Sequence, residues 1–393
     1  MEEGERTFTP GQAEAMDALL SGRNVFLSGN AGTGKSYVLN AFIEELEERE
    51  VPYLAMAPTG IAAQNLHNGT TIHRTLQVGF GVLDPHDENK KTLTRKVLNK
   101  AEVIIIDEVS MCRIDLFERV MNMVLAAKRV SGKPLVVHMH ATEFDRSGEN
   151  INRRVYAIEK AGMQAADRVI AVSELTRRIV IGKYGIPAEK VVTVHNAVRF
   201  GESEDAVPER AVKDKVVTFL GRITYQKGPD YFVEAAAKVL QRVPDVRFVM
   251  AGSGDLMNHV VRRVAQLGIA DRFHFTGFLK GGEVQRMFRL SDVYVMPSVS
   301  EPFGISPLEA MRSGVPVIIS RQSGVAEVLD YAIKVNYWDV DALADAIYGL
   351  LTYPALGRMF ASKGLEEVTG LKWTNAAAKI KTVYETVVAE ANN

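Results

Sequence analysis

Short apolar segments rich in β-branched residues recur along most of the chain, and longer stretches of mixed polar and apolar residues separate them. Continuous apolar segments predict strands that are buried on both faces, and the longer stretches predict the helices that cover them. This alternation indicates an α/β fold built on parallel sheets. The predicted strands are NVFLSG, EVIIIDE, PLVVHMH, RVIAVS, KVVTVH, KVVTFLG, VRFVMAG, RFHFTG, DVYVMPS and VPVIIS.

The pattern breaks in a polar, acidic and proline-containing segment between residues 199 and 214. We interpret residues 201–214 as a linker between an N-terminal and a C-terminal sheet. The end of the chain, residues 371–393, is typical of an amphipathic helix. Four apolar residues lie near one face of this predicted helix: Ala377, Ile380, Val383 and Val387.

The composition of the 393 residues is that of an ordinary soluble protein, with 47% hydrophobic and 24% charged residues. The sequence contains no run of about 18 apolar residues, so we expect no transmembrane helix. A single cysteine, Cys112, excludes an intramolecular disulfide and favours a cytoplasmic location. Residues 1–125 carry 12 Lys and Arg against 18 Asp and Glu, and this acidic balance argues against tight DNA binding by this part.

A phosphate-binding pattern follows the first predicted strand. NVFLSG leads into GNAGTGKS, residues 29–36, and then into a helical pattern, which is the strand, loop and helix order that G-x-x-x-x-G-K-[ST] requires. Lys35 would neutralise the β- and γ-phosphates of a nucleotide, and Ser36 would ligate Mg²⁺. Three glycines would let backbone N–H groups surround the phosphates: Gly29, Gly32 and Gly34.

A second acidic element agrees with this reading and makes a chance glycine-rich turn the weaker alternative. The apolar run Val103–Ile106 ends in Asp107 and Glu108. Asp107 would hold Mg²⁺, directly or through water, and Glu108 would polarise an attacking water. The two elements together predict an ATP–Mg²⁺ site.

Residues 7–122 resemble the first motor domain of the Pif-type and RecD-like superfamily-one helicases, through FTPGQAEAMDALL, GNAGTGKS, APTGIAAQNL, GTTIHRTL and IIIDEVSMCRIDLFERV. The resemblance implies that Gln12 reads adenine. It also implies that Thr59, Gly60 and residues 71–73 approach single-stranded DNA, although a packed turn explains His73 equally well. The sequence shows neither the sensor strand nor the second motor domain of such helicases, so we do not expect processive unwinding.

Two cations follow a strand in the second half of the chain. KVVTFLG leads into GRITYQKG, and Arg222 and Lys227 suit a diphosphate there. By themselves they fit a solvated basic turn as well. The glycines Gly252 and Gly254, after the next strand, are common at plain turns and add little alone.

The strongest pattern of the second half is SEPFGISPLEA, residues 300–310, directly after the strand DVYVMPS. A proline at residue 307 predicts a helix start, and the open N–H groups of such a start favour a phosphate. Glu301 precedes the loop, and Glu309 lies in the first turns of the predicted helix. The pair is suited to holding sugar hydroxyls, with two independent surface glutamates as the alternative.

Residues 126–393 resemble the retaining family-four glycosyltransferases of GT-B fold, in which GRITYQKG, AGSGD, FTGFL, PSVSEPFGISPLEAMRSGVPVIIS and QSGVAEVL occur in this order. The resemblance implies that Arg222 and Lys227 bind the donor diphosphate, Glu309 the ribose and Glu301 the transferred sugar. Further implied contacts to the donor come from Gly252, Gly254, Phe303, Gly304 and Ile305.

The resemblance begins inside the first domain of that family, at about AAKRVSGKPLVVHMHATEFDRSG. His140 aligns with the site histidine that faces the donor sugar, with a satisfied strand-end histidine as the alternative, and His138 receives no role. Asp145 and Arg146 are implied on the acceptor side. VHNAV, residues 194–198, looks like the crossing into the second domain, and the final helix would cross back. Further similarity to the glycogen- or starch-synthase-related subgroup favours an α-glucan acceptor.

The two resemblances together predict a chimera. A P-loop unit would cover residues 1–125, the remainder of a transferase first domain 126–200, and a donor-binding domain 215–370. The fold expected is a P-loop NTPase-like parallel sheet joined to a partial Rossmann-like half, followed by a GT-B C-terminal Rossmann-like domain. The helicase-like segment stands where the family has its opening strand and glycine-rich loop, so a continuous hybrid sheet is physically feasible.

The function expected is retaining transfer of a hexose from a UDP- or ADP-glucose type donor to a glycan, with no metal at the donor site and ATP–Mg²⁺ at the P-loop. Two alternatives stay open. One is an ATP-binding helicase remnant with weak contact to single-stranded DNA, and the other is a chimeric nucleotide-binding protein without turnover.

Overall fold

The strands of the structure, a computed structural model, are parallel wherever they pair, and helices connect most of them. The structure describes residues 8–21, 35–76, 101, 103–106, 128, 134–198 and 213–391. The chain divides into two units, Met1–Ala127 and Lys128–Asn393. The predicted α/β class with parallel sheets is therefore confirmed.

The first unit contains a three-stranded parallel sheet in the order β2-β1-β3. Its core joins helix residues to strand residues, and Phe42 and Ile43 of α2 pack with Ala55 and Ile105 from the two longer strands. The described elements are α1 (Pro10–Leu20), α2 (Lys35–Glu48), β1 (Tyr53–Ala57), α3 (Gly60–Gln64), β2 (Thr70–Thr71), α4 (Ile72–Thr75) and β3 (Val103–Ile106).

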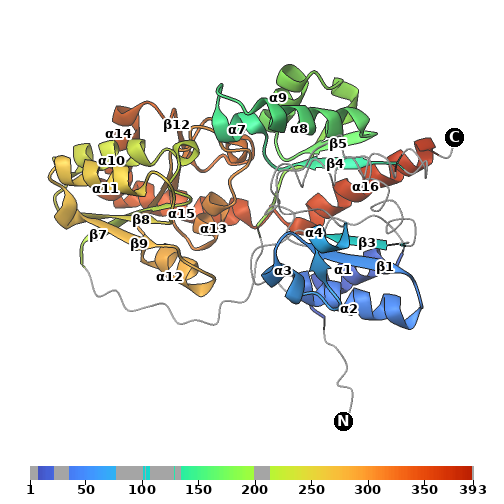
Figure 1. The fold of residues 1–393 in the computed structure, drawn as a ribbon. Coiled ribbons are helices and arrows are strands. Elements are labelled where there is room, and N and C mark those ends of the chain that lie inside the picture. The colour runs from blue at the N-terminus through green and yellow to red at the C-terminus, as the bar shows by residue number, and fades with distance from the viewer. Residues whose placement is uncertain are drawn as a thin grey trace, which may run out of the picture. The chain divides into compact units, whose positions relative to one another are not determined.

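The second unit contains two sheets, and we name its parts by them. The three-stranded lobe comprises residues 134–198 and the last helix, with the strand order β4-β5-β6. Figure 1 shows α8 and α9 on one side of this sheet and the last helix, α16, on the other. Its elements are β4 (Val136–Met139), α7 (Glu143–Ser147), α8 (Arg153–Ala165), β5 (Arg168–Ala171), α9 (Glu174–Tyr184), β6 (Val191–Thr193) and α16 (Trp373–Ala391).

The six-stranded lobe comprises residues 213–370 and has the order β12-β11-β10-β7-β8-β9. Phe219, Phe232 and Phe248 are buried at the centre of its core. Its strands are β7 (Lys215–Leu220), β8 (Val246–Ala251), β9 (Phe273–Gly277), β10 (Val293–Met296), β11 (Val317–Ser320) and β12 (Ile333–Val335). Its α-helices are α10 (Pro229–Leu240), α11 (Met257–Gln266), α12 (Gly282–Leu290), α13 (Ser306–Arg312), α14 (Val340–Thr352) and α15 (Pro354–Val368), and short 3₁₀ turns include η3 (Tyr225–Lys227) and η5 (Gly324–Glu327).

Every predicted strand that falls within the described residues is present, whereas NVFLSG lies outside them. Three strands were missed, namely β1, β2 and β12. They are short or rich in alanine, so their sequences lack the β-branched run that marks the others. Within the first unit β1–β3 form one sheet, and within the second unit β4–β6 form another, so the predicted hybrid sheet stays a prediction.

The two chain segments that pass between the lobes meet each other. Val198, at the end of the outgoing segment, donates its N–H to the carbonyl of Leu371 on the returning segment, at 3.2 Å. Helix α16 then packs Val383 and Val387 against Ile170 of β5, in the three-stranded lobe. Ala376, which the sequence analysis did not name, is also buried, and the predicted Ala377 is half-buried.

Within the described part of the chain, no helix combines the length and the apolar character that crossing a bilayer requires.

Candidate active site at the carboxyl edge of the six-stranded sheet

The strand order of the six-stranded lobe has a switch point between β7 and β10. From β7 the chain continues outward through β8 and β9, and from β10 it continues in the opposite direction through β11 and β12. Connections that leave in opposite directions open a crevice at the carboxyl ends of the strands, where open α/β sheets bind their ligands. Residues 221–228 follow β7, and residues 297–305 follow β10.

An ion pair joins these two loops across the switch point. The ammonium group of Lys227 contacts the carboxylate of Glu301, and the two side chains are 21% and 9% exposed. The hydroxyl of Ser298 lies 3.4 Å from the same carboxylate oxygen. A charge pair so shielded from water is stronger than a surface pair, so it holds both side chains in fixed orientations.

The backbone around Glu301 is bonded to the segment after β11. The Glu301 N–H donates to the carbonyl of Gln322 at 3.1 Å, and the Gly324 N–H donates to the carbonyl of Glu301 at 2.9 Å. Phe303, which is buried, accepts from the N–H of Val325 at 2.7 Å. Gly304 has φ +100°, and a Cβ there would lie 3.1 Å from Cγ of Glu301. Only glycine fits this turn without strain.

The second predicted carboxylate, Glu309, lies in the first turn of α13, which begins at Ser306 with Pro307 inside its start as predicted. Ile305 occupies the position directly before this helix and makes no capping hydrogen bond with its side chain. Burial raises the pKa of Glu309, and Arg312 opposes that rise. Burial also raises the pKa of the Tyr294 hydroxyl, and the charges of both Glu301 and Glu309 add to the rise. The two carboxylates therefore act on one buried tyrosine.

Arg222 shares a loop with Lys227 but is exposed. Its Nη2 donates a long hydrogen bond of 3.4 Å to Oε1 of Gln226. The carbonyl of Gln226 accepts from the N–H of Val299 at 2.9 Å, which ties the loop after β7 to the loop after β10. Arg222 is therefore held on the same crevice and reaches into solvent.

The predicted glycines Gly252 and Gly254 let the loop after β8 pack against the loop after β7. A Cβ at Gly252 would lie 1.9 Å from the carbonyl oxygen of Gly221, and one at Gly254 would lie 2.2 Å from that of Ile223. Both distances are far below contact range. The structure thus gives these glycines a packing role, and their contact with a donor stays a prediction.

His140 and His138 lie at the end of β4, in the three-stranded lobe. The His140 residue is exposed to solvent overall. Partial desolvation of its imidazole ring by neighbouring protein atoms nevertheless lowers its pKa. Burial lowers the pKa of His138 to about 4, and the neighbouring His140 adds to the effect. The Nε2 atom of His138 hydrogen-bonds the hydroxyl of Tyr384 on α16 at 2.9 Å. Sequence reasoning missed this pair, because a local pattern carries no signal for a partner in the last helix.

The two residues predicted on the acceptor side, Asp145 and Arg146, form hydrogen bonds and ion pairs with other residues of the protein. Asp145 is buried, and its Oδ2 accepts from the N–H and the hydroxyl of Thr142 at 2.7 and 2.8 Å. Arg146 forms ion pairs with Glu143 and Glu159, whose side chains are 5% and 12% exposed. Asp145 therefore caps the start of α7, and Arg146 links this helix to Glu159 of α8.

The predicted ATP site is described only in part. Gln12 lies in the first turn of α1, where its Oε1 accepts from the N–H of Thr9 at 3.0 Å in a capping box. Lys35 and Ser36 open α2. The other predicted residues, Gly29, Gly32, Gly34, Asp107 and Glu108, lie outside the described residues.

The residues predicted near DNA include two helix caps. The hydroxyl of Thr59 accepts from the N–H of Ala62 at 3.2 Å at the start of α3, which begins at Gly60. The hydroxyl of Thr71 accepts from the N–H of Arg74 at 3.2 Å at the start of α4, which contains His73. Capping accounts for both threonines without a ligand.

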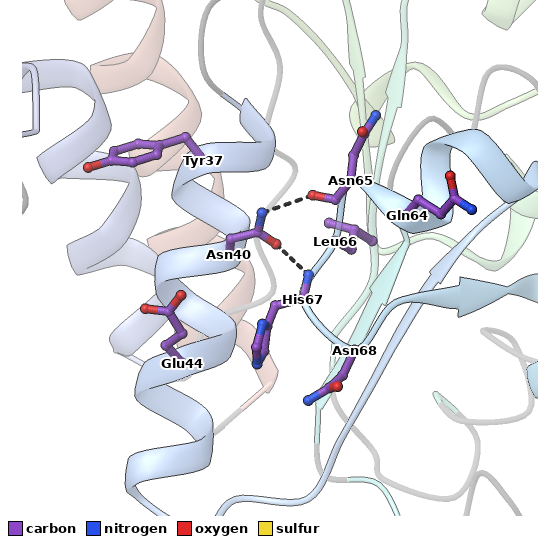
Figure 2. Close-up of a pocket in the computed structure, with 8 residues that line it drawn as sticks. All are labelled: Tyr37, Asn40, Glu44, Gln64, Asn65, Leu66, His67 and Asn68. Atoms are coloured by element: carbon purple, nitrogen blue, oxygen red, sulfur yellow. Dashed lines mark hydrogen bonds between the residues drawn. The ribbon is translucent and has the colours of Figure 1, made fainter.

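A polar pocket of about 450 Å³ lies in the same unit, between α2 and the segment after α3. Figure 2 shows that the side chain of Asn40, on α2, is hydrogen-bonded to the backbone of the segment on the other side of the pocket. Its Nδ2 donates to the carbonyl of Asn65 at 2.8 Å, and its Oδ1 accepts from the N–H of His67 at 2.7 Å. None of the residues predicted for ATP or DNA lines this pocket. Sequence reasoning missed it, because its lining has no charged motif.

Family models match three segments of the chain. The model described as "Glycosyl transferases group 1" matches residues 202–366, and that described as "Glycosyltransferase Family 4" matches residues 113–200. The model described as "PIF1-like helicase" matches residues 8–135.

Curated relatives agree with the first two matches. An uncharacterized glycosyltransferase of Methanocaldococcus jannaschii is 30% identical over 277 residues, which are 66% of this chain and 70% of that protein. An α-1,3-galactosyltransferase of Escherichia coli that acts from UDP-Gal on α-D-GlcNAc-diphosphoundecaprenol is 27% identical, with the same coverage.

Solved structures share the fold. HepE of Anabaena, in complex with UDP and glucose, superposes with a TM-score of 0.64 at 18% identity and covers 85% of this chain and 99% of its own. A sucrose-phosphate synthase from Thermosynechococcus elongatus superposes with a TM-score of 0.61 at 18% identity, covering 86% and 100%. The α/β fold with parallel sheets is thus the GT-B fold of glycosyltransferases. With a relative at 30% identity and two matching family models, the chain belongs to the group 1 glycosyl transferases.

Proposed function

We propose that this glycosyltransferase moves a hexose from a nucleoside diphosphate sugar to a glycan acceptor, with retention of the anomeric configuration. The observation that carries the proposal is the Lys227–Glu301 ion pair at the switch point of the six-stranded sheet. It places a cation for phosphate and a carboxylate for hydroxyl groups side by side. HepE, which shares the fold, was solved with UDP and glucose, and this supports a UDP-glucose type of donor.

The roles of the residues follow from their charge and position. Lys227 and the exposed Arg222 would neutralise the diphosphate, which becomes the leaving group as the bond to the sugar breaks. Glu301 would accept hydrogen bonds from the hydroxyls of the transferred sugar. Glu309, half-buried on α13, would accept from the ribose hydroxyls of the nucleoside. Such contacts orient the donor before the reaction.

The backbone at Phe303 and Gly304 would contact the sugar or the phosphate, because the glycine leaves no side chain over the loop. His140, at the end of β4, would face the sugar from the three-stranded lobe. Its lowered pKa keeps the imidazole neutral at pH 7, so it would act there as a hydrogen-bonding group. An α-glucan is the acceptor we propose, with no metal ion at the donor site.

The test is a transfer assay with UDP-glucose and ADP-glucose as donors and a maltooligosaccharide as acceptor. We expect an elongated product with an α-linkage, formed without added metal, and we expect Glu301→Gln to abolish it. A wild-type protein that binds neither donor, or a β-linked product, would contradict the proposal. Release of free glucose without elongation would support the proposed donor and would exclude an α-glucan as the acceptor.

A second candidate function concerns the N-terminal unit, because residues 8–135 match the helicase model. We propose that this unit binds ATP with Mg²⁺ through residues 29–36 and Asp107, with weak contact to single-stranded DNA. Thermal melting separates the two functions, since a ligand at about 100 times its dissociation constant adds about 2.7 kcal/mol. That is a shift of a few degrees.

We expect ATP–Mg²⁺ and the sugar nucleotide each to raise the melting temperature. Glu309→Ala should abolish the response to the sugar nucleotide and leave the response to ATP intact. Loss of both responses would contradict separate sites, and a response to ATP alone would leave only the second function standing.

A further inference from the structure

We propose that Asp145 is a positioning residue for sugar transfer, because it holds Glu301 in place through Ser300. The proposal rests on the proposed function, in which Glu301 contacts the transferred sugar. It assigns to the three-stranded lobe a part in placing a carboxylate that belongs to the six-stranded lobe.

The carboxylate of Asp145 is buried and divided between two tasks. Its Oδ2 accepts two hydrogen bonds from Thr142, which fix the side chain at the start of α7. Its Oδ1 accepts a hydrogen bond from the hydroxyl of Ser300 at 2.7 Å. Hydrogen bonds to a charged acceptor are about twice as strong as neutral ones, so this contact is a firm one. Ser300 directly precedes Glu301.

A second contact anchors the residue on the other side of Glu301. The hydroxyl of Ser173, which is fully buried at the start of α9, donates to the carbonyl of Pro302 at 2.6 Å. Gly324 lies in the same place, where a Cβ would come within 2.2 Å of the Pro302 carbonyl and 2.5 Å of Cβ of Ser173. Both neighbours of Glu301 are therefore attached to the three-stranded lobe, and its backbone shifts only if one of these bonds breaks.

The anchored segment links the candidate groups of the two lobes. Thr142, which binds Asp145, follows His140 by two residues at the end of β4. Glu301, which follows Ser300, pairs with Lys227, and α7 contacts η3, the turn that carries Lys227. The Asp145–Ser300 bond thus sets the distance between His140 and Glu301. A misplacement of about 1 Å can lower a rate by about 100-fold, so the bond bears on turnover more than on donor affinity.

The variant that tests this is Ser300→Ala, because it removes the bond and leaves the Thr142 cap of Asp145 intact. We expect kcat to fall about 10-fold while KM for the donor stays within about twofold, as for an interaction made mainly in the transition state. Ser300→Thr keeps a hydroxyl and should recover at least half of the activity.

The matched control is Ser291→Ala, which also removes a hydrogen-bonded hydroxyl. Ser291 bonds Thr218 at 2.9 Å and the carbonyl of Met287 at 2.8 Å, just before β10 and so at the opposite edge of the sheet. We expect kcat of this variant within about twofold of wild type. A similar loss in both serine variants would mean a general effect of stability and would overturn the proposal.

Two further results distinguish this proposal from the proposed function. In thermal melting, Asp145→Ala combined with Ser300→Ala should lower the melting temperature less than the sum of the single variants, because the two groups share one bond. A wild type that transfers no sugar defeats the proposed function. An active wild type whose Ser300→Ala variant keeps its kcat, or loses only donor affinity, overturns the positioning role.

Discussion

Two arginines that follow parallel strands have opposite surroundings: Arg222 lies in the loop after β7, and Arg146 lies on α7, the short helix after β4. Arg222, in the six-stranded lobe, is exposed and makes one long hydrogen bond to a neutral amide. Arg146, in the three-stranded lobe, forms ion pairs with two shielded carboxylates, Glu143 and Glu159. The sequence suggested a binding role for both. The difference shows that resemblance to a binding motif does not by itself tell whether the charge of an arginine is already compensated inside the protein.

The same contrast extends to the groups around each arginine. Near Arg146, the hydroxyl of Tyr184 donates to Glu159, and burial and that carboxylate raise the pKa of Tyr184. Near Arg222, Lys227 and Glu301 bridge two loops at the switch point of the sheet. One cluster joins α7, α8 and α9 to each other, and the other lies at the crevice where open sheets bind ligands. Four predictions test this division.

The largest effect is expected from Lys227→Ala. It removes a cation from the diphosphate and leaves Glu301 shielded without its partner, so we expect kcat/KM for the donor to fall by about 100- to 1,000-fold. Steady-state kinetics with the preferred donor measure this. Lys238→Ala is the control, because Lys238 also pairs with an aspartate, Asp341, but on the outer helices α10 and α14. A loss of less than about tenfold for Lys227→Ala would exclude a direct role at the diphosphate.

The next largest effect is the dependence of stability on pH that we expect from His138, in the three-stranded lobe. The pKa of His138 is about 4 in the folded protein, below its ordinary value of 6.5. Between these values the unfolded chain binds a proton that the folded protein does not, so stability falls as the pH drops from 6.5 to 4, by up to about 3 kcal/mol. His138→Gln should flatten the dependence of the melting temperature on pH in this range.

His274→Gln, at an exposed position of β9, is the control and should keep the wild-type slope. An unchanged slope in His138→Gln would show that other groups carry the acid sensitivity.

Alanine substitutions of the two arginines are expected to have effects of intermediate size, one on stability and the other on activity. Arg146→Ala leaves two shielded carboxylates without their cation and should lower the free energy of unfolding by about 2 kcal/mol, with donor binding unchanged. Arg222→Ala should leave stability within about 0.5 kcal/mol and lower kcat/KM by about 30-fold. Melting curves and steady-state kinetics, measured on both variants, give the change in stability and the change in kcat/KM for each. Equal effects of the two variants on either quantity would refute the contrast.

The smallest effect is a gain in stability from Glu309→Gln. Because burial raises the pKa of Glu309, its charged form is disfavoured in the folded protein, and stability is lost as the pH rises through that pKa. We expect the melting temperature at pH 8 to rise by about 1–2 °C, with no gain at pH 4, while donor affinity falls. Glu366→Gln, on the exposed end of α15, should give no gain, because Lys363 lowers the pKa of Glu366.

Much of the fold was predictable from local patterns. The β-branched runs predicted β7 to β11, and Pro307 predicted the start of α13, because strand burial and helix starts depend on neighbouring residues. Short strands such as β2 and β12 were not predictable in this way. They are strands because a neighbouring strand offers hydrogen bonds, which is a property of the sheet and not of their own sequences.

The candidate site divides along the same line. Sequence patterns suggested Lys227, Glu301 and Glu309 as candidates, because the spacing within each motif is local. They missed the bonds of Asp145 to Ser300 and of His138 to Tyr384, which join residues far apart in the chain. They also gave Arg146 a binding role, because its partner Glu159 lies on the next helix and nothing near Arg146 in the sequence announces it.

Gly324 lies where the two lobes of the second unit approach each other closely, around Ser173 and Pro302. Its hydrogen atoms occupy a gap between Ser173 of one lobe and Pro302 of the other that no methyl group can enter. An alanine at this position would therefore force the Pro302 carbonyl or the Ser173 side chain to move. The missing side chain of one residue thus sets how closely the loop after β10 approaches the start of α9.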